Sequence, residues 1–177
     1  MSALPAEFFD VLKANKVVET AQILWVSASE QRLRLFVHRL PTAEFSVSTA
    51  NNGLGCRVNS YQTPTGLLRI ARKIGDGEPV GTIFKERLPA GVFYPSSPIL
   101  HPPSDLILTR ILWLEGLELG INRGGDVDTF SRYIYIHGTN HEEKIGQPAS
   151  HGCIRMRNDD VLNLFDAVEV GSLVWVR

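Results

Sequence analysis

Residues 133–158 read YIYIHGTNHEEKIGQPASHGCIRMRN, and this stretch holds three of the five histidines and one of the two cysteines. The apolar run at 134–136 predicts a strand that ends at the His-Gly pair at 137–138. A polar loop then leads to Ser-His-Gly-Cys at 150–153. A thiol and an imidazole brought together by a loop are the raw material for a nucleophile and its base.

The bulk composition describes an ordinary globular protein. The chain has 177 residues, 44% hydrophobic and 21% charged, with a net charge of -1. This size fits one domain that buries a real core, and the balanced charge gives no indication of nucleic-acid binding. No run reaches the roughly 18 apolar residues that suggest a membrane span. The acidic N-terminus does not resemble a secretory signal, so we expect a cytoplasmic protein, or a periplasmic one if the natural chain begins further upstream.

Short Val-, Ile- and Leu-rich runs between Gly- and Pro-rich segments predict a mainly β protein with a few short helices. A helix is expected at 5–15, and Asn158 is expected to cap a second one. Strands are expected at 21–27, 32–38, 44–49, 67–74, 82–87, 107–114, 134–136 and 173–176, the first three as a meander. We expect Arg34 to face outward and 63–66 to form a tight turn.

Five prolines between residues 88 and 105 predict a long loop without regular ladders. Such a loop is either a lid over a site or a packed surface segment. No linker divides the chain. We therefore expect an N-terminal helical extension at 1–19 and one catalytic domain at 20–177.

The residues alone leave three interpretations of Cys153 open. His137, His141 and His151 are each a possible base for the thiol, and Gly152 lets the backbone approach a substrate closely. The same three histidines with Cys153 could instead hold a tetrahedral zinc ion, although no ligand pair has the usual spacing of a zinc motif. The third interpretation is that they are structural residues.

The motifs IHGT at 136–139 and SHGCIRM at 150–156 together resemble the signature of the L,D-transpeptidase catalytic domain, the YkuD-like family. That signature is a His-Gly on a strand, a loop, and then Ser/Thr-His-Gly-Cys followed by an apolar residue and Arg. Weaker similarity extends over about residues 20–177. The resemblance implies the family's β-sandwich fold, with only the short N-terminal helix outside it.

The resemblance also implies roles for the matching residues. Cys153 would be the nucleophile, and His137 would be the general base that later protonates the leaving amine. The backbone carbonyl of Gly138 would orient His137. The amides of Gly152 and Cys153 would stabilise the tetrahedral oxyanion.

Further residues are expected to contact substrate. Ser150 and His151 would shape the cysteine loop, and Tyr133 and Asn140 are additional pocket candidates. Arg155 would either clamp a substrate carboxylate or support the loop from within, because a guanidinium suits both tasks.

Enzymes of this family attack the bond between meso-diaminopimelate and the terminal D-Ala of peptidoglycan tetrapeptide stems. Transfer to an amine then gives a 3-3 crosslink or an anchor, transfer to water gives a tripeptide, and carbapenems acylate the same cysteine. No metal or organic cofactor, nucleic acid or membrane is implied. With the expected cytoplasmic location, the sequence favours an L,D-carboxypeptidase that acts on recycled muropeptides. L,D-transpeptidation is the close alternative, and a non-catalytic muropeptide binder is a third possibility.

Overall fold

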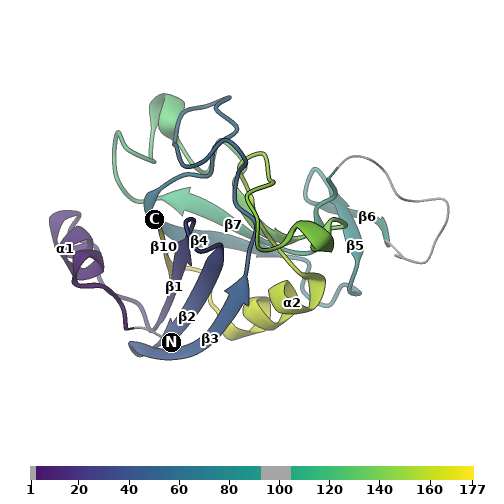
Figure 1. Cartoon of the computed structure of the whole chain (residues 1–177), viewed down its shortest axis with the longest axis horizontal. Helices are drawn as coiled ribbons and strands as arrows, with labels where there is room; N and C mark the ends of the chain where they lie inside the picture. The colour runs from purple at the N-terminus through teal and green to yellow at the C-terminus, as the bar shows by residue number, and fades with distance from the viewer. Residues whose placement is uncertain (1–2, 93–104) are drawn as a thin grey trace.

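The computed structural model describes residues 3–92 and 105–177, and strands dominate it (Figure 1). The helices and strands are α1 (Ala6–Ala14), β1 (Gln22–Ser27), β2 (Arg32–Val37), β3 (Leu40–Ser46), β4 (Gly66–Ile74), β5 (Thr82–Lys85), β6 (Leu88–Val92), β7 (Leu108–Gly116), β8 (Tyr135–Gly138), β9 (Ile154–Met156), α2 (Asn158–Ala167) and β10 (Leu173–Val176). The mainly β fold with a short N-terminal helix is confirmed.

The ten strands form one continuously hydrogen-bonded sheet. Its main path runs β3-β2-β1-β10-β4-β7-β5-β6, and β8 pairs with both β7 and β9. The expected meander of β1, β2 and β3 is confirmed, and β10 joins β1 in parallel register. Strand β8 runs antiparallel to β7 and parallel to β9. The two halves of the reactive stretch are therefore neighbours in the sheet.

The buried side chains of the described residues form three hydrophobic clusters, and the alternation of side chains along the strands separates the two largest. Leu24 and Val26 of β1 belong to the main cluster, together with Ile136, Ile154 and Phe165 from β8, β9 and α2. Because the strands of the site contribute buried residues to this cluster, the core fixes their position.

The intervening residues of β1 and β10 face the second cluster, beneath α1. Phe8 and Leu12 of α1 are buried there with Ile23 and Trp175, and the rings of Phe8 and Trp175 lie 5.7 Å apart. Helix α1 and the β5–β6 hairpin lie at opposite ends of the long axis of the molecule (Figure 1). The helix covers the part of one sheet face that β2, β1, β10 and β4 form.

The expectation that Arg34 faces solvent is wrong. Its side chain is buried, with nitrogens 2.5 Å from a carboxylate oxygen of Glu30 and 2.7 Å from one of Glu44. Its guanidinium also lies 4.9 Å from the centre of the Trp25 ring. A long side chain that keeps its charge paired can cover apolar surface, which the alternating pattern of the strand does not reveal.

Two segments expected to be irregular take part in ladders. Residues 63–66 form no tight turn: Thr63 bridges to Leu54, and β4 begins at Gly66. Gly66 does adopt the left-handed region, with φ +95°. Residues 88–92 form β6 on the outer side of β5, where the missing N–H of Pro89 is tolerated because an edge strand leaves donors unpaired. The remainder of the proline-rich loop, 93–104, lies outside the described residues.

Several element boundaries also differ from expectation, most clearly those of β3 and α2. Strand β3 occupies residues 40–46 instead of 44–49. Arg157 is the N-cap of α2, and Asn158 is the first helical residue. The Asn158 side chain is used elsewhere, since its Nδ2 donates to the Thr139 carbonyl at 2.9 Å.

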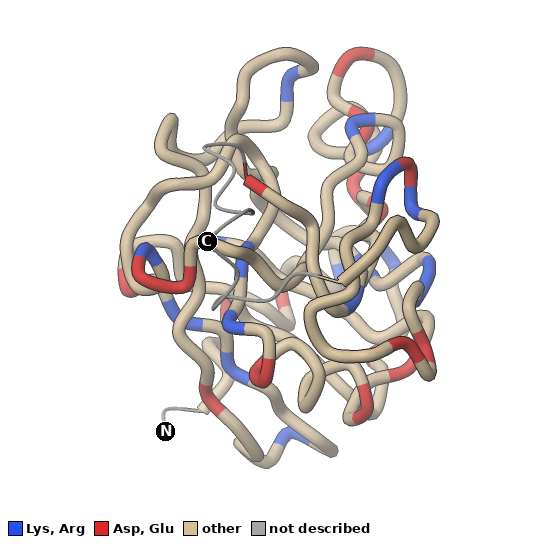
Figure 2. Tube along the Cα trace, turned by 90° about the vertical axis from the view of Figure 1, so that its right-hand side faces the viewer, with Lys and Arg blue, Asp and Glu red and all other residues tan. Residues whose placement is uncertain are grey.

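Acidic and basic residues are interspersed along the chain (Figure 2). This distribution agrees with the net charge of -1. Among the described residues, no helix is long and apolar enough to cross a membrane.

Candidate active site

Strands β8 and β9 bring Cys153 and His137 to the same pocket. In their parallel register Ile136 lies opposite Ile154, and Cys153 immediately precedes β9. The pocket has a volume of about 280 Å³. Its lining residues are Asp105, Ile107, Arg132, Tyr133, Ile134, His137, Ser150, His151 and Cys153.

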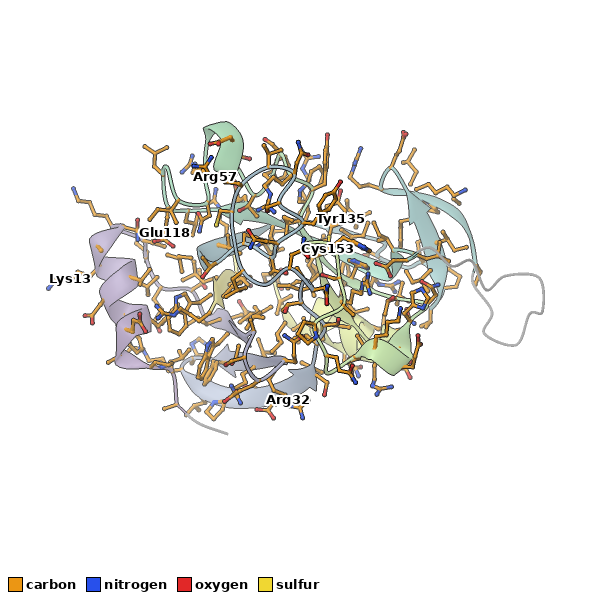
Figure 3. The ribbon with its side chains drawn as sticks, turned by 45° about the horizontal axis from the view of Figure 1, so that its top comes forward. Lys13, Arg32, Arg57, Glu118, Tyr135 and Cys153 are labelled. Atoms are coloured by element: carbon orange, nitrogen blue, oxygen red, sulfur yellow. The ribbon has the colours of Figure 1, made fainter. Side chains whose placement is uncertain are left out.

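The Cys153 sulfur is held by the backbone of β8. Cys153 lies beside Tyr135 (Figure 3). The Tyr135 amide donates to Sγ at 3.3 Å, and the thiol lies 3.6 Å from the Tyr133 carbonyl oxygen. Burial and, to a smaller extent, the charge of Asp105 raise the pKa of Cys153 to about 11, against the opposing effects of the Tyr135 amide and of nearby arginines. At neutral pH the group is therefore a thiol, which needs a base before it can attack.

His137 lines the same pocket as the thiol. Its ring is buried, and its Nδ1 lies 2.7 Å from the Gly138 carbonyl oxygen. A carbonyl only accepts, so Nδ1 carries the hydrogen and Nε2 keeps its lone pair. Burial lowers the pKa of His137, the charge of Asp105 and the Gly138 contact oppose this, and Arg155 adds to the lowering. The imidazole is therefore neutral at pH 7 and can accept a proton.

The loop before β9 is closed by Ser150. Its hydroxyl donates to the Cys153 carbonyl at 2.5 Å and accepts from the Gly152 amide at 3.2 Å. Gly152 has φ +136°, and a Cβ there would lie 3.3 Å from Ile134 Cδ1. The Gly152 amide, expected to face an oxyanion, is thus engaged inside the loop. The polar groups of Ser150 likewise hold the loop together.

Arg155 supports the loop from within. Its side chain is 2% exposed, and its Nε lies 2.8 Å from Asp105 Oδ2. The N–H of Nε is not aimed at this oxygen, so the contact is an ion pair and not a directed hydrogen bond. Asp105 Oδ1 accepts from Thr139 Oγ1 at 2.8 Å, and the Arg155 backbone exchanges two hydrogen bonds with Ser48. Two roles were expected for Arg155, binding a substrate carboxylate or supporting the cysteine loop. Its buried position favours support of the loop.

Of the weaker pocket candidates, two lie at the exposed rim of the pocket and one stabilises a neighbouring segment. Tyr133 and His151 are exposed and line the pocket, and the His151 ring meets Tyr61 edge-on with centroids 6.4 Å apart. Asn140 does not line the pocket; its Oδ1 accepts from the Leu106 amide at 2.7 Å. It secures the segment that leads into β7.

Sequence reasoning missed Asp105 and Arg132, both of which line the pocket. Asp105 follows the proline-rich loop, and Arg132 precedes the strand motif, so neither belongs to the two reactive motifs. The one local indication that Arg132 lies near the site was its position directly before Tyr133. Among the described residues, no group of three or more His, Cys, Asp or Glu side chains is arranged to hold a metal ion. The four residues of the zinc interpretation therefore do not assemble into such a site.

Comparisons with known proteins agree on one family. The family model of the L,D-transpeptidase catalytic domain (YkuD) matches residues 21–176. YqjB of Bacillus subtilis (strain 168), whose name describes it as a candidate L,D-transpeptidase, is 50% identical to this chain over 48 residues. The matched residues are 27% of each chain. ErfK/SrfK of Escherichia coli (strain K12), a probable L,D-transpeptidase, is 53% identical over 25% of this chain and 14% of its own length.

Solved structures share the fold. The L,D-transpeptidase LdtMt1 in complex with imipenem superimposes with a TM-score of 0.55 and 19% identity, over 89% of this chain and 59% of that one. L,D-transpeptidase 3 from Mycobacterium tuberculosis gives a TM-score of 0.57 and 16% identity, over 89% of this chain and 61% of its own. This chain therefore spans only about three fifths of these relatives.

Proposed function

Because this chain belongs to the L,D-transpeptidase catalytic domain family, we propose that Cys153 attacks the bond between meso-diaminopimelate and the terminal D-Ala of a peptidoglycan tetrapeptide stem. One observation carries the proposal. A thiol and a neutral imidazole line the same pocket, and the imidazole is fixed through its Nδ1. This arrangement supports acyl transfer through a thioester.

The proposed reaction uses the neutral pair. His137 Nε2 takes the proton of the thiol as the sulfur attacks the carbonyl carbon of diaminopimelate. Since the Gly152 amide is engaged by Ser150, we assign the developing oxyanion to the amide of Cys153. His137 then returns the proton to the nitrogen of D-Ala, the carbon–nitrogen bond breaks, and the acyl group remains on sulfur as a thioester.

We further propose that water is the acceptor, which makes the protein an L,D-carboxypeptidase acting on recycled muropeptides in the cytoplasm. The exposed rim residues Tyr133 and His151 leave the acyl group open to solvent, which supports hydrolysis. The names of the relatives favour a second candidate, L,D-transpeptidation to a diaminopimelate amine. The two reactions share every step up to the thioester.

The experiment is incubation with free tetrapeptide, with and without an amine acceptor, followed by mass spectrometry. Tripeptide and D-Ala without dimer support hydrolysis, whereas dimer without tripeptide would refute it. Cys153→Ala should abolish turnover, while Cys56→Ala is the matched control because Cys56 is a free cysteine outside the pocket. Tetrapeptide binding without any product would favour the non-catalytic binder. Imipenem is present in the LdtMt1 complex, and a test for covalent labelling of this protein by imipenem gives an independent readout of Cys153.

A further inference from the structure

Arg132 is a half-buried cation in the wall of the reactive pocket. It also lines a second cavity, of about 320 Å³, which shares Tyr133, Ile134 and His151 with the first. Arg132 therefore stands where the two cavities meet. Its charge opposes the rise in the pKa of Cys153, so the guanidinium lies within electrostatic range of the sulfur.

Neutral groups alone hold the Arg132 side chain in place. Nη1 donates to the Gly55 carbonyl at 3.2 Å, and Nη2 donates to the Gln62 carbonyl at 2.7 Å and to Ser60 Oγ at 3.4 Å. A guanidinium has five N–H groups, so these contacts leave donors for a ligand. Among residues 3–92 and 105–177, no carboxylate forms an ion pair with Arg132.

Two other arginines near the site, Arg155 and Arg57, are each paired with a carboxylate. Arg155 is buried against Asp105, so its charge is already matched inside the protein. Arg57, on the same loop as the partners of Arg132, is exposed and lies 3.5 Å from Asp126. Arg132 is thus a preorganised cation with no carboxylate partner among the described residues, in the pocket of the thiol. Such a group is suited to an anionic part of the substrate.

We propose that Arg132 binds a carboxylate of the stem peptide, namely the α-carboxylate of the terminal D-Ala, and so restricts the enzyme to peptides that end at this residue. The inference rests on the proposed function. In the proposed reaction the scissile nitrogen belongs to D-Ala, and its carboxylate lies one Cα beyond that nitrogen. A cation in the same pocket can therefore distinguish a free terminus from an extended or amidated one.

The test compares kcat/KM for three peptides: the free tetrapeptide, its C-terminal carboxamide, and the tetrapeptide amidated on the side-chain carboxylate of diaminopimelate. We expect the wild-type protein to prefer the free acid over the C-terminal amide by about 10- to 100-fold, the range for a charged hydrogen bond. In Arg132→Gln this ratio should fall to about one, through a higher KM for the free acid. A loosened loop would lower both values together and leave the ratio unchanged.

Arg57→Gln is the matched control, since it removes an exposed charge from the loop whose residues hold Arg132. It should preserve the ratio of kcat/KM between the free acid and the C-terminal amide. The inference is overturned if Arg132→Gln affects both peptides equally, or if it abolishes only the preference for the free diaminopimelate carboxylate. If the wild-type protein turns over none of the peptides, the proposed function fails. Arg132 is then tested by calorimetric binding to Cys153→Ser protein, where equal affinity for free acid and C-terminal amide would overturn its role.

Discussion

The Tyr135 amide donates a hydrogen bond to Cys153 Sγ at 3.3 Å, which ties the thiol to the backbone of β8. The contact is independent of the side chain at position 135. It follows from the parallel register of β8 and β9, in which Cys153 comes one residue before the Ile136–Ile154 pair. The same register places His137 beside the loop, so the pairing of two short strands sets the geometry of the site.

Activity should fall as the pH drops below 6.5. Burial lowers the pKa of His137 from the ordinary value of 6.5, so the imidazole is neutral at pH 7 and becomes protonated only at lower pH. Since an imidazolium cannot accept the thiol proton, kcat/KM for D-Ala release should be level near pH 7 and decline through the acid range. A decline that begins above pH 7 would contradict the neutral pair.

The thiol itself should react slowly at neutral pH. Burial raises the pKa of Cys153 to about 11, and only the thiolate reacts rapidly with an alkylating reagent. In Cys56→Ser protein, where Cys153 is the one remaining cysteine, iodoacetamide labelling should quicken about tenfold per pH unit toward pH 11. Rapid labelling at pH 7 that does not change with pH would point instead to a thiolate–imidazolium pair.

The reactive motifs were predictable because the chemistry is local to them. His137, Gly138 and Cys153 lie in two short segments, and the expected contact between the His137 ring and the Gly138 carbonyl is present. Asp105 and Arg132 were missed because their partners lie far away in sequence. Asp105 meets a residue 50 positions later, and Arg132 donates to carbonyls more than 60 positions earlier.

The same limit explains the fold errors. Proline at position 89 argues against a strand when the segment is considered alone, and only the sheet shows that β6 is an edge. Arg34 has the polar identity of a solvent-facing residue, and only the arrangement of Glu30, Glu44 and Trp25 provides partners for its buried side chain. Periodicity reports which face a residue occupies, whereas tertiary contacts determine whether that face is covered.

Gly138→Ala should impair both stability and activity. A Cβ at this position would overlap Asn158 Oδ1 and lie 2.8 Å from the Leu108 backbone oxygen, which cannot move without disturbing β7. The carbonyl that fixes His137 would shift, so we expect destabilisation of about 1–3 kcal/mol and a lower kcat. Urea unfolding and D-Ala release measure the two effects.

Gly146→Ala is the control for this change. Gly146 has φ +100°, but a Cβ there would have no atom within 4 Å. It should cost about 1–2 kcal/mol of backbone strain and leave kcat unchanged. Equal losses of kcat in the two variants would contradict the role of the Gly138 carbonyl.

The ion pair between Arg155 and Asp105 should matter for stability far more than an exposed pair of similar geometry. Arg155 is 2% exposed, so Arg155→Met leaves a partly buried carboxylate without its cation, which should cost about 3–5 kcal/mol in the free energy of unfolding. Arg69→Met, which breaks an exposed pair with Glu115, should cost less than about 1 kcal/mol.

Because the positive charge of Arg155 lowers the pKa of Cys153, Arg155→Met should also shift iodoacetamide labelling of the thiol to higher pH. The double variant Asp105→Asn/Arg155→Met should recover part of the stability, since it removes the unmatched charge. Urea unfolding of all three variants and the wild-type protein measures these costs, and equal costs for Arg155→Met and Arg69→Met would contradict the prediction.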